Sequence, residues 1–533
     1  MPRVLCLILC LARVLTLVPA QAALLQSPSL VTVIRDGTVV ALTNRLTGEG
    51  FAAPTTPPAA VAALHRASQP PLTVRQVTET VTSNRVEQSA TWPTNQASFV
   101  LQAEQQGDSG VIITQQGETA AKGLSGISWG IAGIPDDFEI LVPGCSGQRF
   151  SADAPTGRRE FDYPMGWEAP FVLVQGKQGG VLIRAEDERY RFKNLVLEHG
   201  RRVFNLRFES RNDAPFENKN RIRSSRWRLT AYRGPWQAGA ALYRHWAQTR
   251  YALTPLEQQQ PAWVRNIRFV VIMNLNLPVL QELARHCQPS QTLLYVPNWR
   301  RDGYDRNYPD YTASPSFGPF VEQAHQLGFR VMPHVNYFGC DPKHPLYAQF
   351  KAQQVRDPFS KELLWWDWPA DPPIKFAYIN PASRAWRELF VQRMTEVVQR
   401  HHVDALHLDQ TLCIYNDANG PIDGLNCIEG NVELHRELRR ALPNVALSGE
   451  GLNEVTCRYE AFAQRHVWGM DHAHGTWNDR LIAMSHPVSS AVLTPFTHLY
   501  GYLGMVNPAN TGAFTAWRSR CGPPAATGHC RRR

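Results

Sequence analysis

Two carboxylates lie at the ends of short apolar runs about forty residues apart in the chain. The run "HVDALHLDQT" carries Asp409, and the run "NVALSGEG" carries Glu450. A pair of carboxyl groups suits glycoside hydrolysis, in which an ionised group attacks or stabilises the anomeric carbon and a protonated group donates to the leaving oxygen. If the two runs are neighbouring strands, we expect Asp409 and Glu450 to act together on a sugar.

Alternation along these runs predicts which side chains share a face of a sheet. Successive side chains of a strand point to opposite faces, and leucine and valine suit the layer between a sheet and its helices. The smaller or polar set would then face inward, and in three runs, including "RVMPHVNY", it comprises His334 and Asn336, His407 and Asp409, and Ser448 and Glu450. The alternative is that strand-end acids only cap helices or pair with arginines.

The surroundings of the two acids suggest different roles. We predict Asp409 as the nucleophile, because His407 and Gln410 can keep it hydrogen-bonded and charged. Glu450 follows Ser448-Gly449 and is the predicted acid/base, which needs a raised pKa. Asp471, in "HVWGMD", would end the next strand and is a second candidate for the acid.

Other residues near these strand ends are candidates for binding a sugar, through hydrogen bonds or flat aromatic faces. The predicted substrate-binding residues are Trp299, His334, Asn336, Tyr337, Trp366, His407, Trp468 and His472. For the aromatic residues the alternative is packing within their own loops. The pair His472 and His474 has no matching carboxylate spacing, so no metal site is predicted. The stretch "NDANGPID" offers oxygens for a structural calcium ion, but its spacing favours a turn-rich loop.

The elements that must position these residues fit a parallel barrel. Beyond a polar, proline-bounded linker, apolar strands alternate with helices, which is typical of βα units. We expect strands at "IRFVVIMN", "TLLYVPNW", "RVMPHVNY", "DALHLDQ", "VALSGEG", "HVWGMD" and, more weakly, "LTPFTHLYG". Asn380 is expected to cap the helix before the fourth strand. The pattern predicts a (β/α)8 TIM-type barrel over residues 256–508, followed by an irregular tail at 509–533; without a clear eighth strand, the barrel is either incomplete or closed irregularly.

The first half of the chain has a different texture. Short alternating runs, such as "LVTVIRDGTVVALTN" around an Asp-Gly turn, predict an antiparallel β-sandwich over residues 23–255.

The remaining properties concern location and partners. Residues 1–22 have the features of a secretory signal peptide, and no later segment is apolar enough to span a membrane. We therefore expect a secreted or periplasmic protein. The net charge of +9 is spread along the chain, which argues against nucleic-acid binding. Cys413 and Cys427 bracket one loop, so they form either a local disulfide or two free thiols. The oligomeric state is not determined by the sequence.

These stretches together resemble a known group. "GTVVALTNRLTGEGF" resembles the opening of the β-supersandwich of several glycoside hydrolase families. "HVDALHLDQT", "LSGEG" and "VWGMDH" resemble the barrel of the bacterial domain of unknown function 6259 and of its relatives, the endo-α-N-acetylgalactosaminidases of glycoside hydrolase family 101. The resemblance covers roughly residues 25–508.

The resemblance implies a function. In that group the nucleophile is an aspartate ending strand four and the acid/base a glutamate ending strand five, which match Asp409 and Glu450 by position. It implies retaining hydrolysis of α-linked sugars in an oligosaccharide or glycoconjugate, without a cofactor. The alternative is a non-catalytic carbohydrate-binding protein on a degenerate or truncated barrel. Members of the group usually carry a further β-sandwich after the barrel, and neither that domain nor a clear eighth strand is expected in this sequence.

Overall fold

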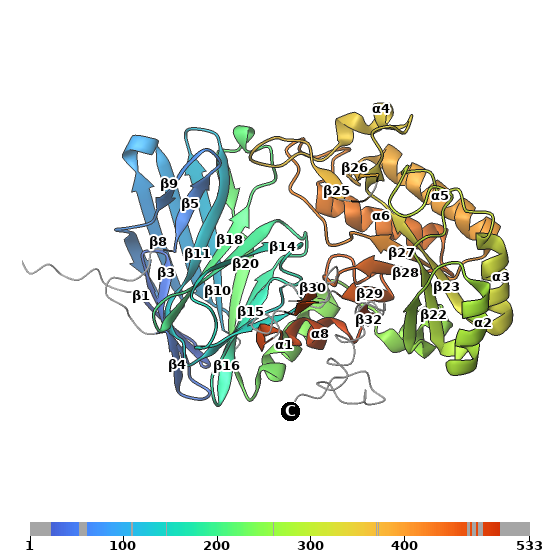
Figure 1. The fold of residues 1–533 in the computed structure, drawn as a ribbon. Coiled ribbons are helices and arrows are strands. Elements are labelled where there is room, and N and C mark those ends of the chain that lie inside the picture. Colours follow the sequence, from blue (N-terminus) through green and yellow to red (C-terminus); the bar gives the residue numbers. More distant parts are fainter. Residues whose placement is uncertain are drawn as a thin grey trace, which may run out of the picture.

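The computed structural model shows a β-rich N-terminal region beside a region of mixed strands and helices (Figure 1). It describes residues 23–52, 61–107, 110–144, 146–259, 261–368, 370, 372–465, 470–471, 476–477 and 483–501. The predicted signal peptide and the irregular tail lie outside these residues.

Two ten-stranded sheets form the N-terminal region, and within them only the pairing of β3 with β11 is parallel. The first sheet contains β1 (Ala23–Gln26), β2 (Leu30–Arg35), β3 (Thr38–Asn44), β4 (Glu49–Ala52), β5 (Ala63–Arg66), β6 (Gln69–Thr73), β11 (Leu124–Pro135), β14 (Gly157–Tyr163), β17 (Lys193–His199) and β18 (Val203–Arg211). The second contains β7 (Thr78–Val81), β8 (Arg85–Trp92), β9 (Ala97–Gln105), β10 (Val111–Thr119), β12 (Glu139–Val142), β13 (Gln148–Phe150), β15 (Phe171–Gln175), β16 (Gly179–Glu186), β19 (Arg221–Arg223) and β20 (Arg226–Arg233).

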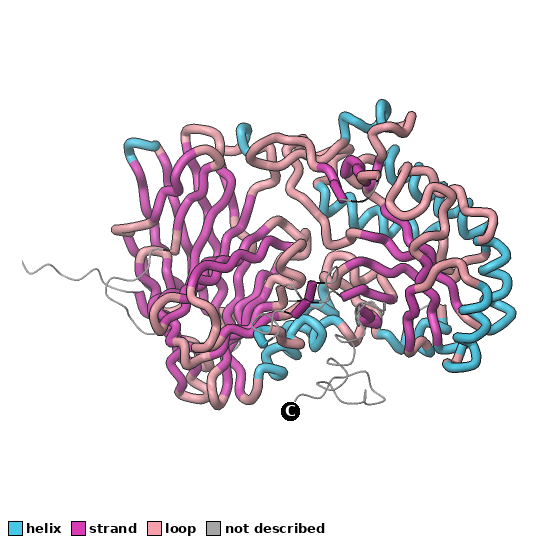
Figure 2. The backbone as a smooth tube through the Cα atoms, in the orientation of Figure 1, coloured by secondary structure: helices cyan, strands magenta, loops and turns pink. Residues whose placement is uncertain are grey.

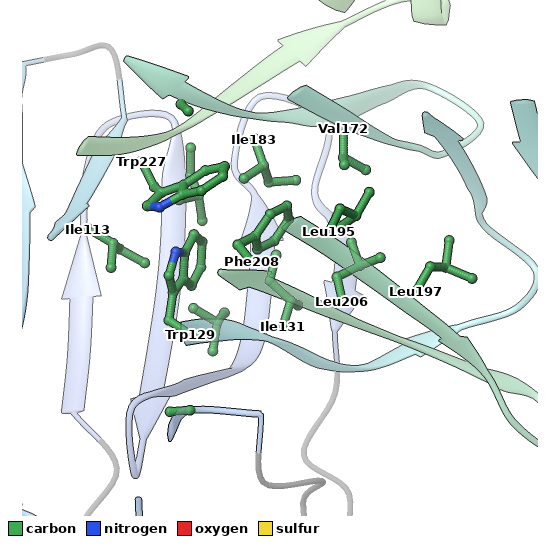
Figure 3. Packing of buried hydrophobic residues seen from close by; sticks show 14 of the residues in the cluster. Ile113, Trp129, Ile131, Val172, Ile183, Leu195, Leu197, Leu206, Phe208 and Trp227 are labelled. Carbon is green, nitrogen blue, oxygen red and sulfur yellow. The ribbon is translucent and has the colours of Figure 1, made fainter. Parts of the chain in front are cut away.

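The predicted Asp-Gly hairpin joins β2 to β3. Asp36 and Gly37 both have positive φ, as a two-residue turn of this hand requires. The alternating side chains of the two sheets form one apolar core, in which Trp129, Phe208 and Trp227 pack together (Figure 3). The predicted antiparallel pattern is therefore present, and it supplies a rigid block against which the second region packs.

The second region is built on a seven-stranded parallel sheet that is nearly closed into a barrel. Its order is β21 (Phe269–Ile272), β22 (Thr292–Val296), β23 (Arg330–Asn336), β27 (Ala405–Asp409), β28 (Ala446–Glu450), β29 (Phe462–Arg465) and β32 (His498–Gly501). His498 Nε2 donates to the Val264 carbonyl, which links the last strand to the segment before the first at 3.0 Å.

Helices cover the outer side of this sheet (Figure 2). They are α2 (Leu277–His286), α3 (Phe317–Leu327), α5 (Arg384–His401), α6 (Cys427–Ala441) and α8 (Val488–Leu493). The expected cap of α5 was wrong: Ser383 caps the helix by accepting from Trp386 N, because Asn380 instead bonds the Asp417 carboxylate. The helix before β28 begins with a capping box formed by Asn426 and Glu429.

The expected sixth strand is misplaced. The sheet takes its sixth strand from β29, whereas Met470–Asp471 forms β30 and pairs antiparallel with β31 (Thr476–Trp477) in a separate two-stranded sheet. The reason is that Ala461 and Phe462 pack in the cluster inside the barrel and Ala463 packs in the cluster with α1 and α8, so this segment pairs with β28 and the strand begins before His466.

The long connection between β23 and β27 folds into its own small sheet. It contains β24 (Gly339–Cys340), α4 (Tyr347–Phe350), β25 (Trp365–Trp368) and β26 (Ile374–Tyr378). This sheet stands at the end of the barrel where the strands finish (Figure 1).

Helix α1 (Trp236–Arg250) joins the two regions. It packs with α8 in a cluster that contains Leu173 and Leu182 of the sandwich and Leu452 and Ala463 of the barrel region. Among the described residues, no helix has the length and apolar character that crossing a membrane would need. Cys413 and Cys427 are both free thiols, so the disulfide alternative is not what the structure contains.

Candidate functional site

The parity predicted for the barrel strands is the one observed. Met332, Ala405 and Ala446 lie in a cluster inside the barrel, whereas Val331, Leu406 and Leu447 lie in the cluster between the sheet and its helices. In the register of β27 with β28, His407 is opposite Ser448 and Leu408 is opposite Gly449. The side chains that face the inside of the barrel therefore change from apolar to polar along the strands, and the polar ones lie at the end where the strands finish.

Asp409 and Glu450 meet at this end of the barrel. Asp409 is 7 % exposed, and a hydrogen bond joins its carboxyl group to that of Glu450. Burial raises the pKa of Asp409 well above its ordinary value, and the charges of Glu450 and Asp305 and the bond from Glu450 raise it further. The raised pKa of Asp409 favours the protonated form of its carboxyl group, which can then donate to Glu450.

The hydrogen bonds around the pair include the expected one from Asn336 to Asp409, whereas those of Gln410 and His407 differ from the expectation. Asn336 Nδ2 donates to Asp409 Oδ2 at 3.1 Å and opposes the rise of its pKa. The main-chain N–H of Gln410 donates to Glu450 Oε2 at 2.9 Å, not to Asp409. Gln410 can do so because its φ of +62° turns the chain sharply after the strand. His407 Nδ1 contacts Ser448 Oγ and the Tyr500 hydroxyl instead of Asp409.

Two buried histidines lie beside the carboxyl pair. The rings of His334 and His407 stack with centroids 5.7 Å apart. His334 Nδ1 lies 2.7 Å from the Tyr295 hydroxyl, and His334 Nε2 lies 3.3 Å from Asp305 Oδ1 and 3.9 Å from Asp409 Oδ2. Both histidines are thus held in fixed orientations at the floor of the site.

Asp305 is a site residue that sequence reasoning missed. It lies in the loop after β22, where the buried Arg300 donates to the carbonyls of Gly303, Arg306 and Asp310. Asp305 has a φ of +54° and is buried, although a loop aspartate is usually exposed. The signal available in the sequence was a carboxylate in "RRDGYDRN", a loop at the active end of a predicted barrel. Tyr304 of the same loop is 39 % exposed, and its ring lies 4.7 Å from that of His334.

The aromatic candidates are mostly not at the pair. Trp299 is fully buried and donates to the His334 carbonyl, and Tyr337 is buried on the outer side of the sheet, where Asn431 bonds its hydroxyl. Trp366 is half-buried in β25 and packs toward Phe376. Trp299 and Tyr337 therefore belong to the buried core and offer no exposed face to a sugar.

Three candidates cannot be located at the site. Trp468 and His472 lie outside the described residues, and Asp471 is placed only as part of β30. In the loop with "NDANGPID", the Asp417 carboxylate accepts N–H groups from Arg356, Asn380 and Asn419. A structural calcium ion there stays the untested alternative to the predicted turn-rich loop.

Comparison with known proteins shows the family of the chain. Residues 224–501, more than half of the chain, match the model of the domain of unknown function DUF6259. The chain belongs to the DUF6259 family. No curated protein matches it by sequence.

Solved structures share the fold of this DUF6259 protein over most of its length. The ligand-free α-N-acetylgalactosaminidase NagBb of Bifidobacterium bifidum is 12% identical, with a TM-score of 0.69 over 92% of this chain and 91% of that one. The same enzyme in complex with Gal-NHAc-DNJ is also 12% identical, with a TM-score of 0.68 over 89% of this chain and 83% of that one. The GH36 α-galactosidase AgaB of Geobacillus stearothermophilus is 10% identical, with a TM-score of 0.50 over 88% and 76%. At these identities the likeness concerns the fold.

Proposed function

We propose that this protein is an exported retaining glycoside hydrolase that acts on α-linked sugars, with Asp409 as the nucleophile and Glu450 as the acid/base. The observation that carries the proposal is the contact of the two carboxyl groups at the ends of adjacent barrel strands. Active sites of TIM barrels are built at this end. Within the proposal the seven-stranded sheet is an incomplete (β/α)8 barrel and the two N-terminal sheets are the supersandwich of the enzyme.

The separation of the acids supports retention over inversion. Retaining glycosidases hold their carboxyl groups about 5–5.5 Å apart, and inverting ones about 6.5–9.5 Å apart to admit a water molecule. Asp409 and Glu450 are close enough to share a hydrogen bond, so only a small displacement by the bound sugar gives the retaining distance.

In the proposed reaction the proton shared by the two acids is transferred to Glu450. When the sugar binds, the proton passes along the hydrogen bond to Glu450, leaving Asp409 ionised. Glu450 then gives the proton to the glycosidic oxygen as Asp409 attacks the anomeric carbon and the leaving group departs. In the second step Glu450 takes a proton from water, whose oxygen displaces Asp409 from the sugar.

The side chains around the pair suit contact with a sugar ring. Asn336 fixes the Asp409 carboxylate, and Asp305, which His334 Nε2 contacts, can accept a hydrogen bond from a hydroxyl group. The exposed Tyr304 ring offers a flat apolar face at the opening. We propose an oligosaccharide or glycoconjugate as substrate, and α-linkage because the neighbouring structures are named as α-galactosidases and α-N-acetylgalactosaminidases.

Three further parts of the proposal depend on the sequence. These are export by residues 1–22 to the periplasm or the medium, the relation to glycoside hydrolase family 101, and Asp471 as a substitute acid. The second candidate function, carbohydrate binding without catalysis, is favoured by one observation: strand β21 pairs only with β22, so its other edge is open among the described residues.

The test uses aryl glycosides and azide. A panel of 4-nitrophenyl α- and β-glycosides should identify an α-glycoside that the protein hydrolyses, and Asp409→Ala should lower its kcat on the order of 10⁴-fold. Azide should then restore turnover and give the β-glycosyl azide, because it enters from the face that Asp409 occupied. Azide with Glu450→Ala should give the α-glycosyl azide.

The product anomers assign the roles independently of the rates. Exchanged anomers would exchange the roles of the two acids. Binding of saccharides without hydrolysis of any glycoside by the wild-type protein would favour the non-catalytic alternative.

A further inference from the structure

Three donor atoms from two neighbouring strands converge at the floor of the site. One ring nitrogen each of His334 and His407 and one carboxylate oxygen of Asp409 all lie within 4.8 Å of one another, and all three residues are buried. They come from the ends of β23 and β27, so the sheet itself fixes their spacing.

The second ring nitrogen of each histidine is held by a hydroxyl group. Tyr295 contacts His334 Nδ1 at 2.7 Å, and Tyr500 contacts His407 Nδ1 at 2.9 Å, with Ser448 Oγ at 3.1 Å. A ligand bond from either ring would therefore be made by Nε2. Metal-binding histidines are oriented in this way, with the outer nitrogen fixed by a hydrogen-bonding group.

The charges of the surroundings favour a cation. Three carboxyl groups, those of Asp305, Asp409 and Glu450, act on one another in a buried space. Asp409 and Asp305 have Asn336, Tyr308 and His334 as neighbours, and an imidazole contributes no positive charge when it is neutral. A dication would offset this concentration of negative charge.

We propose that His334, His407 and Asp409 form a binding site for a zinc-type divalent ion, with an open position for water or a sugar hydroxyl. Two imidazoles and one carboxylate suit zinc and its neighbours, whereas calcium and magnesium prefer oxygen ligands alone. Because ligands bound tetrahedrally at about 2.0–2.1 Å lie roughly 3.3 Å apart, the donor atoms would draw together by up to about 1.5 Å.

The consequence for activity rests on the proposed function, whereas metal binding does not. An ion bound to the Asp409 carboxylate withdraws the nucleophile and fills the space of the sugar. Zinc should therefore inhibit hydrolysis in competition with the substrate.

The experiment is calorimetric titration of zinc chloride into the full chain in a non-chelating buffer, without substrate. We expect one zinc per chain, at least tenfold weaker binding in His407→Ala, and about 10- to 100-fold weaker binding in Tyr295→Phe, which keeps all three ligands but loses the orienting hydroxyl. His286→Ala is the matched control, because His286 is an exposed histidine beside Glu282 on α2 and should leave the affinity unchanged.

Binding that persists unchanged in both His407→Ala and Tyr295→Phe, or no binding by the wild-type chain, would overturn the proposal. If the variants do not fold, the visible absorption spectrum of the wild-type chain with cobalt(II) is the test. It should show the bands of a low-coordinate nitrogen–oxygen site, and their absence would count against the proposed metal site. A chain that binds zinc in this way but hydrolyses no glycoside would refute the proposed function and leave the metal site standing.

Discussion

Asp409 and Glu454 are two buried acids with raised pKa values and very different surroundings. Glu454 is 0 % exposed and lies where the segment after β28 meets the sandwich. It accepts hydrogen bonds from Tyr163 at 2.7 Å, from Tyr251 at 3.2 Å and from Tyr243. Burial raises its pKa to about 7, and the tyrosine hydroxyls oppose the rise.

The difference lies in what each carboxyl group faces. The two oxygens of Glu454 receive three O–H donors from rigid elements, so the group is held in place with its acceptors satisfied. Asp409 receives one amide N–H from Asn336 and faces two other carboxyl groups. Burial with a raised pKa therefore does not by itself mark a catalytic acid; the proposed mechanism also requires a second acid in contact.

The largest expected effect is a fall in kcat on mutation of Glu450 that mutation of Glu454 does not cause. Glu450→Gln should lower kcat by about 10²–10⁴-fold on a substrate with a poor leaving group, because no proton reaches the glycosidic oxygen. Activated aryl glycosides need little protonation and should lose much less. Steady-state kinetics on the two substrate types measures this.

Glu454→Gln provides the matched change, four residues away in the chain. It should leave kcat unaltered at temperatures where the variant is folded. An equal loss of kcat in both variants would remove the distinction between the two acids, and an equal loss by Asp471→Asn on poor leaving groups alone would transfer the acid role to Asp471.

The second effect concerns stability and pH. The ordinary pKa of Glu454, 4.5, is raised to about 7 on folding, so between these values the folded state binds the extra proton. Its contribution to stability is present below pH 4.5, is lost as the pH rises toward 7, and is constant above; the loss is about 3 kcal/mol.

Urea denaturation of the wild-type chain and of Glu454→Gln, from pH 4.5 to 7.5, measures this effect. The pKa of Glu168 is also raised to about 7, so only the difference between the two proteins isolates Glu454. A difference that stays constant over this range would mean that Glu454 does not titrate there.

A third, smaller effect tests the support beneath Glu450. A Cβ at Gly449 would lie 2.2 Å from Glu460 Oε1 and 2.4 Å from Thr411 Oγ1, and Glu460 is itself held by His435 at 3.2 Å. Gly449→Ala should therefore destabilise the protein by about 1–3 kcal/mol and lower activity by shifting Glu450. Gly50→Ala is the control, since its nearest neighbour is 3.9 Å away; equal unfolding midpoints for the two variants would contradict the expectation.

The smallest effect concerns Tyr304, the exposed aromatic residue beside His334. Tyr304→Ala removes the exposed ring above His334 and should raise KM about three- to tenfold with little change in kcat, whereas Tyr304→Phe should keep most of the affinity. An unchanged KM in Tyr304→Ala would show that the sugar does not contact this ring.

The residues on the strands could be predicted from the sequence. Alternation in "ALHLD" and "VALSGE" is sufficient to bring Asp409 and Glu450 to one face, because a strand in a closed sheet leaves a side chain only two directions. The same rule should have excluded Tyr337, whose parity is opposite to that of Asn336. The sandwich hairpin was predictable for a similar reason, since Asp-Gly fixes the turn.

The residues on loops could not be predicted in this way. Asp305 reaches the site only because Arg300 gathers three carbonyl groups of its loop, a tertiary arrangement with no periodic signature. The sixth strand was misplaced because "HVWGMD" is more strand-like in composition than Phe462–Arg465, while inner-face packing selects the latter. The bonding of Gln410 to Glu450 instead of Asp409 depends on a single backbone dihedral angle.

The anchoring of Glu454 also bears on how such a chain can evolve. Its three hydroxyl partners come from β14, from α1 and from the residue that follows α1, all before the barrel begins in the chain. A recombination event near residue 255 that exchanged the N-terminal half would leave this carboxylate without donors, next to the strand that carries Glu450. We therefore expect the two halves to have been inherited together rather than shuffled as separate modules.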